Sequence, residues 1–313
     1  MPRPGRVRLC HETAQCYIPV ADVRRGGRGS EERGEAMTVH DPIFRIGVVA
    51  VHPFGLFVAM GIVLGYVVAL WRVPRAGLPA RYLPGMLIVV VLGSLVTARL
   101  AFVALQPDTV RDGLQGVLSL WRGGLSLAGG VIGGAVLLAL YTWARGEQLW
   151  PWADALAPAA SLGLAVGMLG LPYSGEGWGL PTQGWFFMRV APALRPAALM
   201  SATRFQPIFA YEAVLFTALT VLLLALSRQQ RRMGRPAAGS VGLTFLLVTM
   251  LGYGALRPLT LDATHGPVVL QTQMLCAAAA AYAFVLLALR IWRTHREVEI
   301  AREIKRAQRT SSG

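Results

Sequence analysis

Long apolar stretches constrain the fold of this chain more than any other feature of its sequence. Seven of them approach or exceed the roughly 20 residues that an α-helix needs to cross the hydrocarbon core of a bilayer. They cover residues 52–71, 83–105, 125–143, 153–172, 208–226, 241–256 and 268–291, of which the sixth is the shortest. Because the stretches are continuous rather than alternating, they predict helices and not barrel strands. We therefore expect an all-α, polytopic membrane protein with about seven transmembrane helices.

The composition agrees with a lipid environment. Hydrophobic residues make up 54% of the chain and charged residues only 15%. In a typical soluble domain, roughly a quarter of all residues are charged. The 30 Lys and Arg exceed the 16 Asp and Glu and leave a net charge of +14. Because the arginines stand between apolar runs, orientation in a membrane explains this excess better than binding of nucleic acid does. The 3 cysteines form no CxxC pair, so we expect no disulfide framework and no zinc site from them.

Basic residues are concentrated after alternate stretches, and this pattern predicts the orientation of the chain. They follow the first, fifth and seventh stretches: Arg72, Arg75 and Arg81; Arg228, Arg231, Arg232 and Arg235; and Arg293, Arg296, Arg302, Lys305, Arg306 and Arg309. The loops of the opposite side carry charges of both signs. The pattern predicts an external N-terminal side and a cytoplasmic C-terminus.

The chain divides into three parts by composition. Residues 1–40 are basic and lack an apolar core, so they do not form a signal peptide. We interpret them as an over-long gene start, with translation beginning at Met37, or alternatively as a disordered extension. Residues 41–293 form the expected membrane domain. Residues 294–313 form a basic cytoplasmic tail, expected to be solvated, with an amphipathic helix as the alternative.

The predicted topology brings unusual polar residues to the external side. Arg99 lies in the outer third of the second stretch and Glu212 in the first turn of the fifth. Ionisable groups inside spans cost about 2.5–3.5 kcal/mol or more, so they usually face a cavity and a partner. The same side also receives Gly123, Gly124, Gly129, Gly130, Glu176, Tyr211, Arg257 and Gln273.

Such a set suits the phosphate of an anionic lipid headgroup, because Arg offers a bidentate fork and a glycine-rich helix start offers N–H donors. Each residue also has a structural explanation when it is taken alone. Glycines four apart let membrane helices approach closely, and an Arg at the end of a span can anchor it at the interface.

Several motifs occur in a characteristic order and spacing. They are PFGLF at 53–57, ARL at 98–100, GGLSLAGGVIGG at 123–134, the segment 153–179, PIFAYE at 207–212 and GYGALR at 252–257. Over residues 41–292 the chain resembles the prolipoprotein diacylglyceryl transferases. The resemblance implies a seven-span enzyme of the bacterial cytoplasmic (inner) membrane. Such an enzyme moves diacylglycerol from phosphatidylglycerol to the lipobox cysteine that follows the signal peptide of a secreted prolipoprotein, without a metal or cofactor.

By position, the resemblance implies catalytic roles for Glu176 and Arg257. We assign substrate binding to Arg99, Gly123, Gly124, Gly129, Gly130, Gly179, Tyr211, Glu212 and Gln273. The partners expected from the resemblance are phosphatidylglycerol, the prolipoprotein signal peptide and membrane lipid, and no nucleic acid.

The chain departs from the family pattern at several positions. Ala128 stands where the family has histidine, and Met168 and Leu171 stand where it has arginine and asparagine. Phe54 replaces a tyrosine, and Leu261 replaces a glutamate. Because these replacements are apolar, they leave no equivalent chemistry, and we expect a transferase of reduced or altered activity.

Two other functions remain open. The first alternative is a non-catalytic relative that binds phospholipid or a lipoprotein precursor. A small-solute transporter is the second, although it would need coupling residues near the membrane midplane, and the charged residues here gather at one face.

Overall fold

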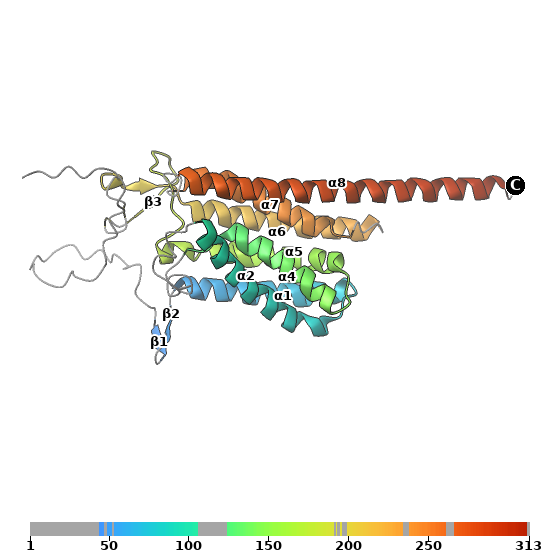
Figure 1. Cartoon of the computed structure of the whole chain (residues 1–313), viewed down its shortest axis with the longest axis horizontal. Coiled ribbons are helices and arrows are strands. Elements are labelled where there is room, and N and C mark those ends of the chain that lie inside the picture. Colours follow the sequence, from blue (N-terminus) through green and yellow to red (C-terminus); the bar gives the residue numbers. More distant parts are fainter. Residues whose placement is uncertain are drawn as a thin grey trace, which may run out of the picture. The chain divides into compact units, whose positions relative to one another are not determined.

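The computed structural model describes residues 44–46, 49–51, 53–105, 124–190, 192, 195, 199–233, 238–260 and 266–311. Its long helices are α1 (Pro53–Arg75), α2 (Leu83–Leu105), α4 (Leu127–Ala144), α5 (Leu149–Met168), α6 (Ile208–Met233), α7 (Ser240–Leu256) and α8 (Gly266–Ser311) (Figure 1). The short 3₁₀ helices are η1 (Ala80–Tyr82), η4 (Leu171–Ser174) and η7 (Arg257–Leu259). This architecture confirms the predicted all-α, polytopic fold.

Strands occur only as two short antiparallel pairs within the described residues. β1 (Phe44–Ile46) pairs with β2 (Val49–Val51), and β3 (Met188–Arg189) pairs with β4 (Arg204–Phe205). Both pairs lie outside the long apolar helices, so they do not alter the fold class.

Six of the long helices are long and apolar enough to cross a membrane: α1, α2, α4, α6, α7 and α8. The remaining predicted span corresponds to α5, whose sequence includes Asp154, Pro158 and Ser161. α5 packs against α1, α6 and α7. Because its neighbours enclose it, α5 presents little surface to lipid and needs less hydropathy than they do.

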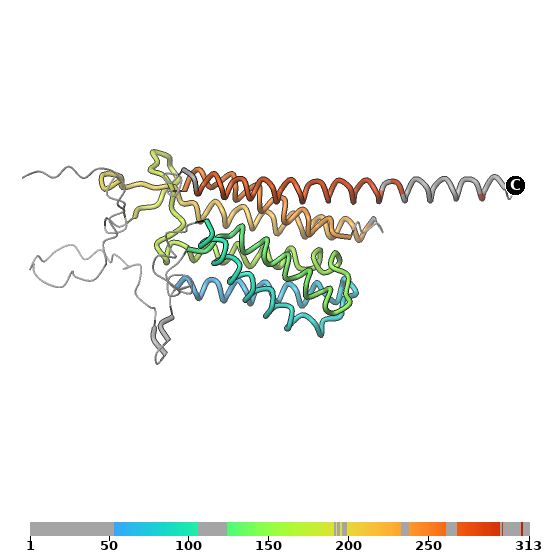
Figure 2. Tube along the Cα trace, viewed as in Figure 1, coloured from blue at the N-terminus to red at the C-terminus, as the bar shows by residue number. Residues whose placement is uncertain are grey.

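Some predicted boundaries were wrong, and the errors have a common cause. α1 continues to Arg75 and α6 continues to Met233, so Arg72 lies in the last turn of α1, and Arg228 lies within α6 and not in a loop. α8 runs without a break to Ser311, so the predicted tail is helical as far as Ser311. Figure 2 follows the Cα trace through the long helices, from α1 in blue to α8 in red. Charged residues end an apolar run in the sequence, but they do not end a helix, because a helix satisfies its backbone hydrogen bonds whatever its side chains.

Small residues bring neighbouring helices together. α1 packs most extensively against α5, and α2 against α4. A Cβ on Gly61 of α1 would lie 2.5 Å from the carbonyl oxygen of Gly163 in α5, so the two backbones are nearly in contact. In α4, a side chain on Gly133 would overlap Thr97 of α2. This is the packing expected in a membrane, where close backbone approach replaces the hydrophobic effect between helices.

Large apolar side chains cover the outside of the bundle. Val63 and Ile88 are each 59% exposed, and Val214 is 68% exposed. Exposed apolar area on this scale is foreign to a soluble monomer and is suited to contact with lipid chains.

A buried arginine joins α1 to α5 and α6. Arg72 donates from Nε to the carbonyl of Ala155 (2.9 Å), and from Nη2 to the carbonyl of Asp154 (3.1 Å) and to Ser227 Oγ (2.9 Å). The carbonyl of Asp154 has no helical donor, because the residue four positions later is Pro158, which lacks an N–H group. Arg72 therefore supplies from another helix the hydrogen bond that α5 cannot make for itself.

The Asp154 side chain fixes the start of α7. Its two carboxylate oxygens accept hydrogen bonds from the backbone N–H groups of Gly239 (2.6 Å) and Gly242 (2.8 Å). A carboxylate at a helix N-terminus satisfies donors that the helix leaves open. The same α5 segment carries Trp150, and the guanidinium of Arg290 in α8 lies 3.8 Å from the centre of its ring.

Candidate functional site

The end of α2, the starts of α4 and α6, and the ends of α5 and α7 meet at one end of the bundle. Hydrogen bonds connect them: Arg99 to Gly124, Gly124 to Glu176, Gly179 to Gln206, and Leu180 to Leu259. Residues far apart in the sequence therefore come together at this end, where α2 and α5 end and where α4 and α6 begin.

Arg99 is buried and bound to the glycine-rich segment. It is 6% exposed, and its Nη1 donates to the carbonyl of Gly124 (2.9 Å). Gly124 has φ +76°, and a Cβ there would lie 2.5 Å from the ring of Phe102 and 3.0 Å from Arg99 Nη1. Both the backbone conformation and the lack of space require glycine at this position.

Glu176 extends this chain of contacts. The backbone N–H of Gly124 donates to Glu176 Oε1 (3.3 Å), so Gly124 links the arginine of α2 with the carboxylate that follows η4. Gly175 and Gly177, on either side of Glu176, both have φ +79°. These left-handed glycines make the tight turn that presents the carboxylate.

Gly179 joins two helix ends through its backbone. Its N–H donates to the carbonyl of Gln206 (2.8 Å), just before α6, and the N–H of Leu180 donates to the carbonyl of Leu259 (2.9 Å), just after α7. A Cβ on Gly179 would overlap the carbonyl oxygen of Leu259. Glycine at this position is explained by backbone packing.

Glu212 and Arg257 form a second charged group. Glu212 is 6% exposed near the start of α6, and the charge of Arg257 acts on it. The Arg257 guanidinium carbon lies 5.5 Å from the centre of the Tyr253 ring. The amide of Gln273 contacts the carbonyl of Gly254 at 3.5 Å, which is too long for a strong hydrogen bond.

The remaining predicted binding residues serve other contacts. The Tyr211 ring lies 5.9 Å from the Phe186 ring. The N–H of Gly129 donates to Ser126 Oγ (3.2 Å), and that of Gly130 donates to the Ser126 carbonyl (2.9 Å). These two N–H groups are thus engaged by the cap of α4 and not offered to a ligand. Gly123 lies outside the described residues.

Three of the residues that depart from the family pattern pack against apolar side chains. Ala128 is fully buried in a cluster with Met250, Tyr253 and Cys276. Met168 lies in a separate cluster, against which Leu171 packs. Leu261 lies outside the described residues. Ala128, Met168 and Leu171 therefore pack among apolar side chains and provide no polar group at these three positions.

Tyr253 was not among the candidate residues, although it is 94% buried beside Arg257. The signal for it was present in the sequence, because residues four apart share one face of a helix. Among the described residues, no three His, Cys, Asp or Glu side chains are grouped so that they could hold a metal ion.

Comparison with known proteins agrees with this geometry. Residues 41–295 match the family described as prolipoprotein diacylglyceryl transferase. A relative from Acaryochloris marina, named phosphatidylglycerol–prolipoprotein diacylglyceryl transferase, is 31% identical over 184 residues, which are 59% of this chain and 67% of the relative. Proteins of the same name from Synechococcus elongatus and Parasynechococcus marenigrum are 27% identical over 211 residues and 29% identical over 222 residues. These matches cover 67% and 70% of this chain, and 72% and 80% of the respective relatives.

The family match spans α1 to α7 and α8 as far as residue 295, and it includes every candidate site residue. The chain therefore belongs to the prolipoprotein diacylglyceryl transferase family.

Proposed function

We propose that this protein transfers the diacylglyceryl group of phosphatidylglycerol to the cysteine thiol of a secreted prolipoprotein. The thiol first loses its proton, because the thiolate is the nucleophile and a free thiol has a pKa of about 8.5. The sulfur then bonds to the glyceryl carbon while the carbon–oxygen bond to phosphate breaks. Glycerol phosphate leaves with the electron pair, and the product is a thioether.

The observation that carries this proposal is the meeting of two charged groups at one end of the bundle. The first is the Arg99–Gly124–Glu176 chain of contacts. The second comprises the buried Glu212 and Arg257, whose guanidinium lies beside the Tyr253 ring. A guanidinium placed where negative charge develops stabilises a departing phosphate. We assign phosphate binding to Arg99 and Arg257. Glu176 is assigned to positioning the glycine-rich segment and the incoming signal peptide.

One observation favours a second candidate, a non-catalytic relative that binds phospholipid or a lipoprotein precursor. Ala128 is fully buried among apolar side chains, and Met168 and Leu171 pack in the core. These positions therefore contribute neither a proton acceptor nor a phosphate contact. Residual activity would rest on the two charged groups alone.

Complementation separates the two candidates. The unmodified chain is expressed in a bacterial strain depleted of its own diacylglyceryl transferase, and transfer to a lipobox peptide is measured in membranes from the same cells. We expect slow transfer, because removal of one electrostatic contact commonly costs about 10²–10³ in rate and several contacts are replaced here. Retention of phosphatidylglycerol without any transfer would instead support the non-catalytic relative.

We also propose that the site faces outward from the bacterial inner membrane and that the arginine-rich helix ends face the cytoplasm. The support is the concentration of arginine in the last turns of α1 and α6. Reporter fusions after Arg235 and Gly313 are both expected to report the cytoplasm. A periplasmic signal from either fusion would contradict this orientation.

A further inference from the structure

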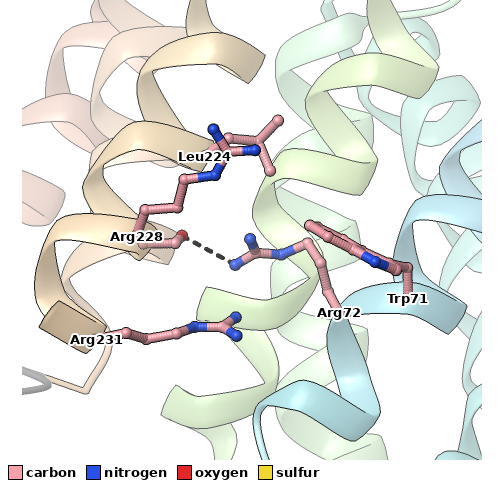
Figure 3. Close-up of a pocket in the computed structure, with 6 residues that line it drawn as sticks. Trp71, Arg72, Leu224, Arg228 and Arg231 are labelled. Atoms are coloured by element: carbon pink, nitrogen blue, oxygen red, sulfur yellow. Dashed lines mark hydrogen bonds between the residues drawn. The ribbon is translucent and has the colours of Figure 1, made fainter.

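A small pocket lies between the last turns of α1 and α6, away from the candidate site. Its lining consists of Trp71, Arg72, Leu224, Ser227, Arg228 and Arg231. Figure 3 shows the side chains of Arg72 and Arg231 extending towards each other across the pocket, while Arg228 runs along α6 and ends beside Leu224. None of the lining residues carries a carboxylate. Along α6 the lining residues Leu224 to Arg231 are roughly 18–28 Å from Glu212, at 1.5 Å per helical residue, so the pocket is separate from the charged groups described above.

Arg72 is the buried member of this pocket, with 4% of its surface exposed. A guanidinium has five N–H donors, and three of those of Arg72 are used by the carbonyls of Asp154 and Ala155 and by Ser227 Oγ. In the part of the chain that the structure describes, the two N–H groups on Nη1 have no acceptor. These two donors belong to a side chain that lines the pocket, so they are available to an acceptor that enters it.

The residues that line the pocket carry only positive charges, on Arg72, Arg228 and Arg231. The charge of Arg231 acts on Arg72, and the Asp154 carboxylate only partly offsets it. That carboxylate is already engaged by the N–H groups of Gly239 and Gly242. Like charges brought together near a membrane repel one another strongly. An anion bound between the arginines would offset this repulsion and would accept hydrogen bonds from the two N–H groups on Arg72 Nη1.

We propose that this pocket binds the phosphate of an anionic ligand, with a phospholipid headgroup favoured over free phosphate. Phosphate oxygens accept hydrogen bonds from several guanidinium groups at once. The lipid is favoured because Trp71, which is 46% exposed, and Leu224 supply an apolar wall beside the arginines, as tryptophan does at membrane interfaces. Basic pockets between membrane helices are suited to such headgroups.

The test uses the full chain in mild detergent and native mass spectrometry with phosphatidic acid. Diacylglycerol, which has the same acyl chains but no phosphate, is the matched ligand control. The R228Q/R231Q variant removes two exposed arginines from the pocket. The R145Q/R232Q variant removes the same charge from exposed positions that do not line it. Thermal unfolding of both variants checks that the fold is retained.

We expect affinity for phosphatidic acid to fall about tenfold or more in R228Q/R231Q, because charge-assisted contacts are lost, and to stay within about twofold in R145Q/R232Q. Inorganic phosphate is then added as a competitor. Displacement of the lipid at millimolar phosphate would assign the site to free phosphate, whereas lipid retention would assign it to the phospholipid. Equal loss in both variants, or equal binding of diacylglycerol, would overturn the proposal.

Discussion

Replacement of Arg257 by alanine is expected to lower diacylglyceryl transfer by about 10²–10³-fold, the usual effect of removing one preorganised electrostatic contact. Arg257 follows α7, stands over the Tyr253 ring and acts on the buried Glu212 carboxylate. Its loss removes a cation from the position assigned to the leaving phosphate. The rate is measured with a lipobox peptide in proteoliposomes that contain phosphatidylglycerol, and binding of that lipid is measured alongside it.

Two controls keep this result specific. Arg204 is exposed in β4 and lies 4.4 Å from the centre of the Phe187 ring, so R204A removes the same charge without touching the site.

The R257A variant also leaves Glu212 without its cation, which is costly for a buried group. The E212Q/R257Q variant removes both charges and is expected to recover stability but not transfer. Recovery of transfer in that double variant, or an equal loss in R204A, would show that Arg257 does not contact the phosphate.

Replacement of Arg72 by alanine is expected to destabilise the bundle by several kcal/mol, because each hydrogen bond from a charged group is worth about 1.5–3 kcal/mol. Three hydrogen bonds to α5 and α6 are lost together, and the Asp154 carbonyl is left without a donor. The measurement is thermal unfolding in mild detergent, followed by near-ultraviolet circular dichroism.

Arg75 provides the matched control, one helical turn further along α1. It is exposed, and its Nη1 donates to the carbonyl of Trp71 in its own helix. R75A removes the same charge but no contact between helices, so a change below about 1 kcal/mol is expected. Similar unfolding temperatures for R72A and R75A would mean that the Arg72 contacts contribute little to the fold.

The apolar runs predicted the helices well where neighbouring residues alone determine the boundary. α2 begins and ends at the predicted residues, because its apolar run stops at Gln106 and Pro107 in the sequence. The end of α1 was predicted too early because Arg72 reads as a residue that belongs in water. Its place inside the bundle depends on carbonyl groups of α5, more than 80 positions away, and no local pattern carries that information.

For the candidate site, the sequence predicted where the residues lie but not which groups they contact. The alternation of helix direction was enough to place Arg99, Glu176 and Arg257 at one end of the bundle. The partners were not predictable, because Arg99 and Glu176 both contact the backbone of Gly124, and backbone groups are the same in every residue. For the same reason the sequence did not distinguish glycines that serve a ligand from glycines that serve packing, such as Gly129 and Gly133 against α2.

The dependence of α5 on Arg72 has a consequence for the biogenesis of the protein. Pro158 leaves the Asp154 carbonyl open, and an open carbonyl in lipid costs several kcal/mol. α5 is also not among the described helices that are long and apolar enough to cross a membrane. Because α1 precedes α5 in the sequence, Arg72 is synthesised before the carbonyl that it binds. We therefore expect insertion of α5 to depend on docking against α1, and a chain that lacks α1 to hold α5 in the membrane poorly.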